Sequence, residues 1–135
     1  MVNKNMVKII IADDQYNMRL LMKRIVLPLN YMIVGEAANG GAVLDLYEKE
    51  QPDILLLDIE MPVKNGVKVL EEVLEKDPEA CVIMMTSVAD SDIVRQCLKL
   101  GAVNYILKTT PVKDIRQRIK ETYEKHRLKK SPSDK

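Results

Sequence analysis

The chain has 135 residues, which is enough for one domain with a sizeable core but not for two domains of ordinary size. Its 21 Lys and Arg nearly balance its 20 Asp and Glu, so no overall field attracts nucleic acid or a membrane surface. Cys81 and Cys97 lack CxxC spacing, and no apolar stretch has the length of a signal-peptide core or a transmembrane helix. We therefore expect a cytoplasmic domain that binds neither nucleic acid nor membranes directly.

In chain order, five short apolar runs alternate with segments of helical period. The runs predict strands over residues 7–12, 32–37, 54–57, 82–85 and 105–107. Helices are predicted from residue 17 and over residues 42–50, 66–75, 91–100 and 112–125. Runs that are apolar at every position, as in 54–57, are typical of parallel strands buried on both faces. The pattern predicts an α/β domain over residues 1–126, followed by a polar basic tail over 127–135.

Polar side chains follow four of the predicted strands. Asp13 and Asp14 follow the first strand, Asp58 the third, Thr86 the fourth and Lys108 the fifth. Because the carboxyl ends of parallel strands meet at one edge, where open α/β sheets bind ligands, we expect these residues to converge. Converging carboxylates repel one another unless a cation neutralises them, and an all-oxygen ligand set favours Mg²⁺. A lysine and a hydroxyl beside that metal suit a phosphoryl group.

Each of these residues also has an ordinary structural interpretation. Asp or Thr after a strand commonly caps a helix or forms a turn, and a lone Lys is usually solvated. Five such residues at four strand ends, of types that suit one metal and one anion, favour a functional site. His126 has no second His or Cys nearby, so we expect it to be solvated in the polar tail rather than bound to a metal.

The order and spacing of these residues resemble the receiver domain of two-component response regulators, in particular its stand-alone members. The resemblance rests on Asp13-Asp14, on Asp58 followed by Met61-Pro62 and Gly66, on Thr86-Ser87 and on residues 101–108. It covers about residues 6–126. It implies a flavodoxin-like, doubly wound (βα)5 fold with a five-stranded parallel sheet in the order 2-1-3-4-5.

The resemblance also assigns chemistry to the predicted site. Asp58 would accept a phosphoryl group from a phosphohistidine of a sensor histidine kinase or a histidine phosphotransfer protein. Mg²⁺ would be held by Asp13, Asp14, Asp58 and the backbone carbonyl of Glu60. Lys108 would neutralise charge on the transferring phosphoryl group. Catalysis would be limited to the chain's own phosphorylation and dephosphorylation, so the chain is not expected to be an enzyme with turnover.

A conformational switch is the second implication of the resemblance. The hydroxyl of Thr86 would bind the attached phosphoryl group, and Tyr105 would turn inward as Thr86 moves. This movement would remodel the face made by the fourth helix, the fifth strand and the fifth helix, and so control a downstream protein target. The ordinary interpretation of Tyr105 is a strand residue whose hydroxyl lies in water.

A departure from the family pattern lies directly after the lysine. The family usually places a proline after the lysine, in a cis peptide that aims the side chain, whereas Thr109 follows Lys108 here. A cis bond before a residue other than proline costs about 3 kcal/mol. A trans bond is therefore at least as well supported, and the aim of Lys108 stays open at this stage.

Alternative functions remain. A pseudo-receiver would bind partners without phosphorylation, and a receiver could belong to a longer regulator with a DNA-binding or enzymatic output domain. Haloacid-dehalogenase-type phosphatases also form an aspartyl phosphate and carry an acid two residues later, as Asp58 and Glu60 do, but Met61-Pro62 does not match their continuation. A flavin-binding domain is disfavoured, because no Ser/Thr-rich phosphate loop follows the first strand.

Overall fold

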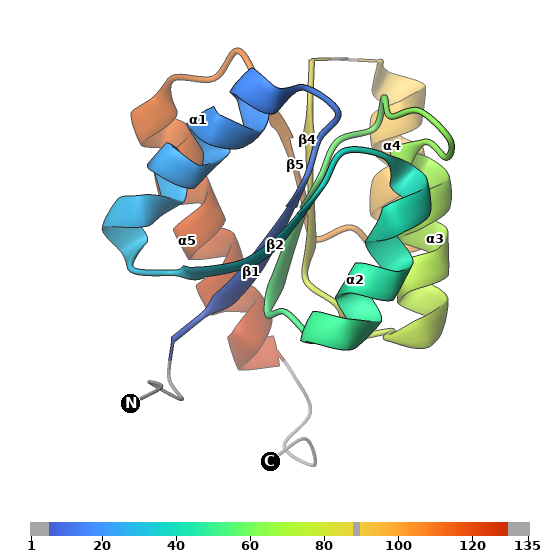
Figure 1. The fold of residues 1–135 in the computed structure, drawn as a ribbon, viewed down its shortest axis with the longest axis horizontal. Coiled ribbons are helices and arrows are strands. Elements are labelled where there is room, and N and C mark those ends of the chain that lie inside the picture. The colour runs from blue at the N-terminus through green and yellow to red at the C-terminus, as the bar shows by residue number, and fades with distance from the viewer. Residues whose placement is uncertain (1–5, 88–89, 130–135) are drawn as a thin grey trace.

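The fold is described from a computed structural model, which covers residues 6–87 and 90–129. Within these residues, five parallel strands lie in the order β2-β1-β3-β4-β5 (Figure 1). They are β1 (Lys8–Ala12), β2 (Met32–Ala37), β3 (Ile54–Leu57), β4 (Val82–Thr86) and β5 (Asn104–Leu107). The predicted fold class and strand order are confirmed, and each strand boundary lies within one residue of its prediction.

A helix follows each strand. The helices are α1 (Tyr16–Val26), α2 (Val43–Glu50), α3 (Gly66–Lys76), α4 (Ser91–Leu100) and α5 (Val112–Lys129). The bounds of α4 match the prediction because local signals set them: the Asp90 side chain accepts a hydrogen bond from the Asp92 N–H at 2.8 Å, and Gly101 ends the helix at φ 125°. Within the two described ranges, no helix is both long and apolar enough to cross a lipid bilayer.

The helices cover both faces of the sheet, with α1 and α5 on one face and α2, α3 and α4 on the other (Figure 1). Side chains along β1 alternate between the two resulting cores. Ile10 packs in the core shared with α2, α3 and α4, whereas Ile9 and Ile11 pack in the core shared with α1 and α5. Because apolar side chains fill both faces, the polar groups that follow the strands gather at the edge of the sheet.

The C-terminal helix is longer than predicted. The sequence predicts its end at residue 125, but α5 continues to Lys129. The Tyr123 ring packs edge-on against Tyr31, with ring centroids 6.3 Å apart, and His126 Nε2 donates to the carbonyl oxygen of Glu79 at 2.8 Å. His126 is therefore a contact between α5 and the segment before β4 rather than a fully solvated tail residue. Residues 130–135 of the predicted tail lie outside the described part of the chain.

Candidate functional site

The residues predicted at the strand ends lie together at the carboxyl edge of the sheet, uppermost in Figure 1. Asp13 follows β1, Asp58 follows β3, Thr86 ends β4 and Lys108 follows β5. The parallel register places the last residues of these neighbouring strands side by side, so the residues that follow share one edge. A cleft of about 290 Å³ opens there, and its lining residues are Asp14, Gln15, Asp58, Glu60, Ser87 and Lys108.

Three of the predicted carboxylates form a cluster. Asp13, Asp14 and Asp58 each offer one oxygen, and these oxygens lie within 4.8 Å of one another. Asp13 and Asp58 are 2% and 4% exposed, whereas Asp14 is open to solvent. The Asp13 N–H donates to the Ala37 carbonyl at 3.0 Å, and its Oδ1 accepts from the Gln15 N–H at 2.9 Å. Two buried carboxylates and one exposed carboxylate make an oxygen ligand set that suits a hard divalent ion such as Mg²⁺.

Lys108 points into this cluster. Its Nζ lies 2.6 Å from Asp13 Oδ2 and 3.2 Å from Asp58 Oδ2, and its backbone N–H donates to the Thr86 carbonyl at 2.8 Å. The described residues contain no cis peptide bond, so the bond between Lys108 and Thr109 is trans. The departure from the family pattern at Thr109 therefore leaves the lysine directed at the two buried carboxylates.

The charges of the cluster are unbalanced, because three carboxylates face one ammonium group. Burial raises the pKa of Asp58; the Lys108 charge opposes this rise, and the Asp13 charge adds to it. Burial disfavours the charged form of Lys108, but its hydrogen bonds and charge pairs with Asp13 and Asp58 prevail and raise the pKa of its ammonium group. The lysine therefore stays protonated, and a second cation beside Asp58 would relieve the remaining repulsion.

The two residues predicted to form a switch are in contact. Thr86 is fully buried at the end of β4, and Tyr105 on β5 is half-buried. Their side chains are hydrogen-bonded to each other, and burial raises the pKa of the Tyr105 phenol. Tyr105 also lines a second cleft, of about 370 Å³, together with Val94, Leu107, Thr110 and Arg118. The phenol of Tyr105 thus connects the carboxyl edge to the α4-β5-α5 face, while the movement of the pair stays a prediction.

The loop after β3 begins at Asp58. The Glu60 side chain is exposed, and the Glu60 N–H donates to the Asp58 carboxylate; the role predicted for the Glu60 carbonyl stays a prediction. The Gly66 N–H donates to the Ile59 carbonyl at 2.7 Å. A Cβ at Gly66 would lie 2.1 Å from the Asp58 carbonyl oxygen, so only glycine allows this approach.

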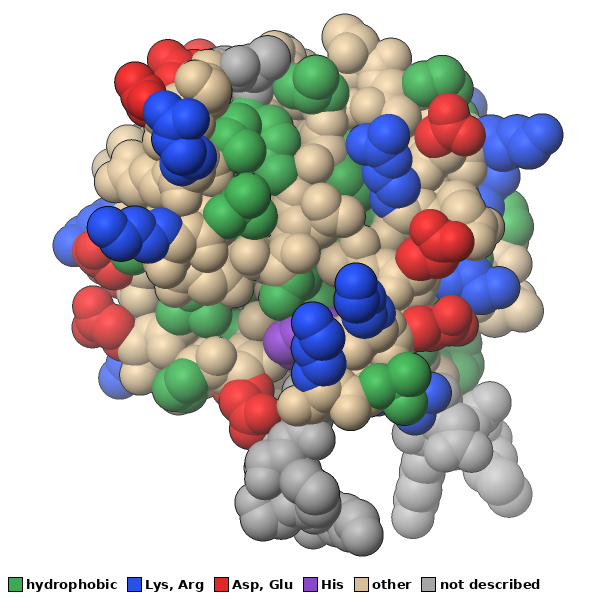
Figure 2. Space-filling view, turned by 180° about the vertical axis from the view of Figure 1, so that it is seen from behind, with side chains coloured by type: hydrophobic (Ala, Val, Ile, Leu, Met, Phe, Trp, Pro, Cys, Tyr) green, Lys and Arg blue, Asp and Glu red, His purple; other side chains and the backbone are tan. Residues whose placement is uncertain are grey.

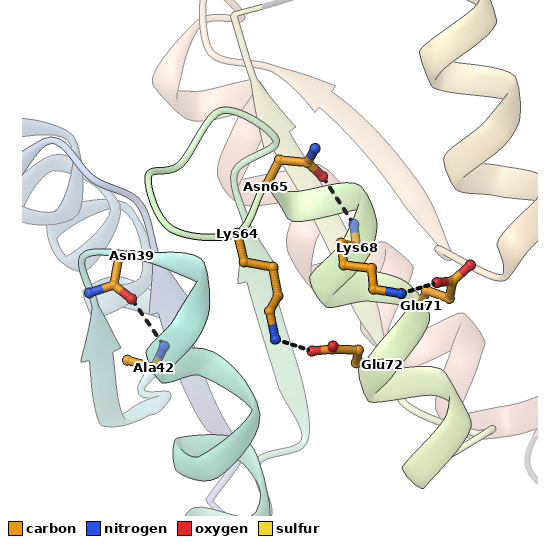
Figure 3. A network of polar contacts seen from close by, with 7 residues as sticks. All are labelled: Asn39, Ala42, Lys64, Asn65, Lys68, Glu71 and Glu72. Atoms are coloured by element: carbon orange, nitrogen blue, oxygen red, sulfur yellow. Dashed lines mark hydrogen bonds and ion pairs between the residues drawn. The ribbon is translucent and has the colours of Figure 1, made fainter.

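Contacts on both sides hold this β3–α3 loop (residues 58–65), and Figure 3 shows those on the side of α3. Lys64 Nζ pairs with Glu72 Oε1 on α3 at 2.7 Å, and Asn65 Oδ1 accepts from the Lys68 N–H at 3.0 Å, which caps α3. On the side of α2, a Cβ at Gly40 would lie 1.7 Å from the Lys64 carbonyl oxygen. The loop that leads from Asp58 is therefore packed tightly between the start of α2 and α3.

Sequence reasoning missed one residue at this edge, Arg19 of α1. Its Nη1 donates to the Asp13 carbonyl at 2.8 Å, and its Nε donates to Glu36 Oε1 at 3.2 Å. In the sequence Arg19 is one polar residue between the apolar residues of an amphipathic helix. No local pattern indicates either contact, because both depend on how α1 packs against the loop after β1 and the end of β2.

A larger groove lies at the opposite end of β5 but is a weaker candidate. Its volume is about 540 Å³, and its lining residues are Val103, Asn104, Glu121, Thr122, Lys125, His126 and Lys129. Figure 2 shows basic side chains beside the histidine on this face. The ionisable groups have both signs, and the acid and the two lysines are exposed on α5. The smaller cleft, with buried charges that converge on one point, is therefore the candidate functional site.

The strand order and the acidic site place this chain in a class of protein. That class is the flavodoxin-like domains with carboxylates and a lysine at the carboxyl edge of the sheet. The family model for the response regulator receiver domain matches residues 9–120. The chain therefore belongs to the response regulator receiver domain family of two-component systems, as the resemblance predicted.

Individual relatives and solved structures agree with this assignment. Protein CcdB of Bacillus subtilis is 44% identical over 103 residues, which are 76% of this chain and 86% of that protein. Sporulation initiation phosphotransferase F of the same organism is 34% identical over 114 residues, 84% of this chain and 91% of that protein. The CheX-CheY-BeF3-Mg²⁺ complex from Borrelia burgdorferi matches with a TM-score of 0.83 and 28% identity, covering 87% of this chain and 89% of the matched chain.

Proposed function

We propose that the chain accepts a phosphoryl group on Asp58 from the phosphohistidine of a sensor histidine kinase or histidine phosphotransfer protein. The observation that carries the proposal is the position of Lys108, whose Nζ lies 2.6 Å from Asp13 and 3.2 Å from Asp58 within the acidic cluster. A fixed ammonium group beside a buried carboxylate suits the transfer of an anionic group, because such chemistry depends on positioning and charge neutralisation.

The ligand set fits Mg²⁺. Asp13, Asp14 and Asp58 would supply carboxylate oxygens, and the Glu60 carbonyl would supply a fourth protein oxygen. Burial is the main cause of the raised pKa of Asp58 and the Asp13 charge adds to it, so a divalent cation beside the carboxylate would favour its charged form. When bound, Mg²⁺ supplies positive charge beside the phosphoryl oxygens. The Borrelia CheY relative was solved with BeF3 and Mg²⁺, which supports a similar ligand here.

The transfer is a displacement at phosphorus. A carboxylate oxygen of Asp58 attacks the donor phosphorus, and a new O–P bond forms as the P–N bond to the donor imidazole breaks. The electron pair of the broken bond passes to the imidazole nitrogen, and the product is an acyl phosphate. Lys108 neutralises part of the charge on the transferring group. The N–H of Glu60, which already donates to the Asp58 carboxylate, keeps the nucleophile in place.

The signal would leave through Tyr105. The Thr86 hydroxyl is hydrogen-bonded to the Tyr105 side chain, so recruitment of Thr86 to a phosphoryl group on Asp58 would break that contact and free the tyrosine to turn inward. The cleft of about 370 Å³ on the α4-β5-α5 face would change shape with it. We propose that a downstream protein binds this face, and the complex of the Borrelia CheY with CheX supports a protein as the target.

The alternatives have less support. The support for a phosphorylation-independent pseudo-receiver is Thr109 after Lys108, and the aim of Lys108 at Asp13 and Asp58 weighs against it. We propose self-catalysed phosphotransfer without turnover of an external substrate, because the carboxylate that takes the phosphoryl group is part of the protein. Steady release of phosphate from a phosphomonoester would favour a phosphatase instead.

The test is the intact mass of the protein after incubation with Mg²⁺ and acetyl phosphate. Wild type is expected to gain one phosphoryl group, and Asp58→Ala is expected to gain none. Asp45→Ala, which removes an exposed carboxylate on α2, is the matched control and should be modified like wild type. Absence of the gain in folded wild type would refute the phosphoacceptor function and favour the pseudo-receiver.

A further inference from the structure

Arg19 joins the β1–α1 loop (residues 13–15) to the end of β2. Its side chain is 16% exposed. Nη1 donates to the Asp13 carbonyl at 2.8 Å, Nε donates to Glu36 Oε1 at 3.2 Å, and the guanidinium carbon lies 5.7 Å from the centroid of the Tyr16 ring. A planar guanidinium group with contacts in three directions has one well-defined orientation.

The carboxylate that anchors Arg19 is itself held in place. Glu36 Oε2 pairs with Lys23 Nζ at 2.6 Å, and Glu36 lies beside Ile11 in the parallel register of β2 and β1. Hydrogen bonds and charges from Lys23 and Arg19 keep the pKa of Glu36 below its usual value. Arg19 is therefore tied to the sheet at its Nε and presents its Nη1 to the loop.

The carbonyl that Arg19 binds belongs to the peptide group between Asp13 and Asp14. A peptide group is planar, so the direction of this carbonyl also sets the direction in which the chain continues into Asp14. The amide on the other side of Asp13 is held by the Ala37 carbonyl at 3.0 Å. With both peptide groups held, the two adjacent carboxylates keep one arrangement relative to Asp58.

We propose that Arg19 is a positioning residue for the divalent metal, because it holds the peptide plane that presents Asp13 and Asp14 to the ion. The inference rests on the proposed function, which supplies the metal, and deepens it by adding a residue that touches neither carboxylate. Geometry and charge predict opposite effects on metal binding when the Arg19 side chain is replaced by an uncharged one. Removing a positive charge near a cation site strengthens cation binding by electrostatics alone, whereas loss of the correct geometry weakens it.

The experiment is calorimetric titration of metal-free protein with Mg²⁺ at constant ionic strength, on wild type, Arg19→Met and Lys23→Met. Methionine keeps the apolar stem and helix propensity of either residue but removes the donors. The Mg²⁺ Kd is expected to rise about tenfold in Arg19→Met. Lys23→Met removes an equal charge from the same Glu36 but leaves Arg19 with its bonds to Glu36 and to the Asp13 carbonyl, so its Kd should stay within about twofold of wild type.

Two further readouts, the phosphorylation rate and the Tm of the metal-free protein, separate positioning from stability. At saturating Mg²⁺, the rate of phosphorylation of Arg19→Met by acetyl phosphate should return to within about threefold of wild type, since the defect lies in metal binding. An unchanged or lower Kd in Arg19→Met would overturn the inference, whatever happens to the Tm of the metal-free protein. If Arg19→Met does not fold, Arg19→Lys carries the test with a smaller rise in Kd. Wild type that binds no Mg²⁺ would instead refute the proposed function itself.

Discussion

The β1–α1 loop and the β3–α3 loop both carry acidic residues of the site, but they are held in different ways. The first depends on a side chain, because Arg19 reaches across to the Asp13 carbonyl at 2.8 Å. The second depends on close backbone packing, because a Cβ at Gly40 or Gly66 would collide with carbonyl oxygens of the loop. Loss of the Arg19 side-chain contact would alter the geometry of the metal-ligating carboxylates. A side chain added where the backbone packs closely would displace the whole loop and destabilise the fold.

The largest effects are expected at the two glycines that pack against the β3–α3 loop. Gly40→Ala and Gly66→Ala place a Cβ 1.7 Å and 2.1 Å from backbone oxygens, so each should lower the free energy of unfolding by about 3 kcal/mol or more. Urea denaturation measures this loss. Gly41→Ala is the control, because its Cβ would meet at 2.9 Å the side chain of Val63, which is exposed and can move. Near-wild-type stability of Gly66→Ala would show that this loop is not held by its backbone.

A substitution at Val63, in the same loop, is expected to stabilise the protein. Its φ is 72°, and the Lys64 N–H donates to the Pro62 carbonyl at 2.8 Å, which makes a tight turn centred on a β-branched residue. The side chain is 83% exposed, so little burial is lost on its removal. Val63→Gly should raise the free energy of unfolding by about 1 kcal/mol, because relief of the left-handed strain exceeds the entropy cost of glycine. Val63→Ala keeps the strain and should show no such gain in the same denaturation experiment.

The pH dependence of stability tests the ion pairs of Glu36, which anchor Arg19 beside the β1–α1 loop. The pKa of Glu36 is lowered in the folded state by Lys23 and Arg19, so its contribution to stability is present above the pKa of the unfolded chain and is lost as pH falls through the folded pKa. At pH 7 the free energy of unfolding of wild type should exceed that of Glu36→Gln by less than about 1 kcal/mol, because these ion pairs are partly solvated. Denaturation at several pH values below 5 should show this difference in the free energy of unfolding becoming smaller as the pH falls. A difference that grows would contradict the predicted direction of the pH dependence.

The smallest effect is expected for the ion pair between Lys64 and Glu72, which ties the β3–α3 loop to α3 (Figure 3). Both side chains are partly exposed, at 32% and 24%. A double-mutant cycle with Lys64→Met and Glu72→Gln should give a coupling energy of about 0.5 kcal/mol that falls as salt is added. A coupling above about 2 kcal/mol would mean that this loop, like the β1–α1 loop, depends on a side chain.

Local patterns account for what could be predicted. The run over residues 54–57 is apolar at every position because β3 is buried on both faces, and the structure reproduces its limits. The limits of α4 follow from Asp90 at its start and Gly101 at its end. The end of α5 was missed because Tyr123 and His126 are held by Tyr31 and Glu79, which lie far away in the sequence. Patterns of polarity do not report contacts at such separations.

The sequence by itself determined the fold class, the strand order through its family resemblance, and the set of carboxylates, lysine and threonine at the strand ends. These follow from periodicity and from residue types at chain positions that any parallel sheet brings to one edge. Only the tertiary structure decided that Lys108 reaches Asp13 and Asp58 with a trans bond before Thr109, that Thr86 and Tyr105 are in contact, and that Arg19 holds the Asp13 carbonyl. The reason is that these features depend on distances between side chains on different elements, and packing sets those distances.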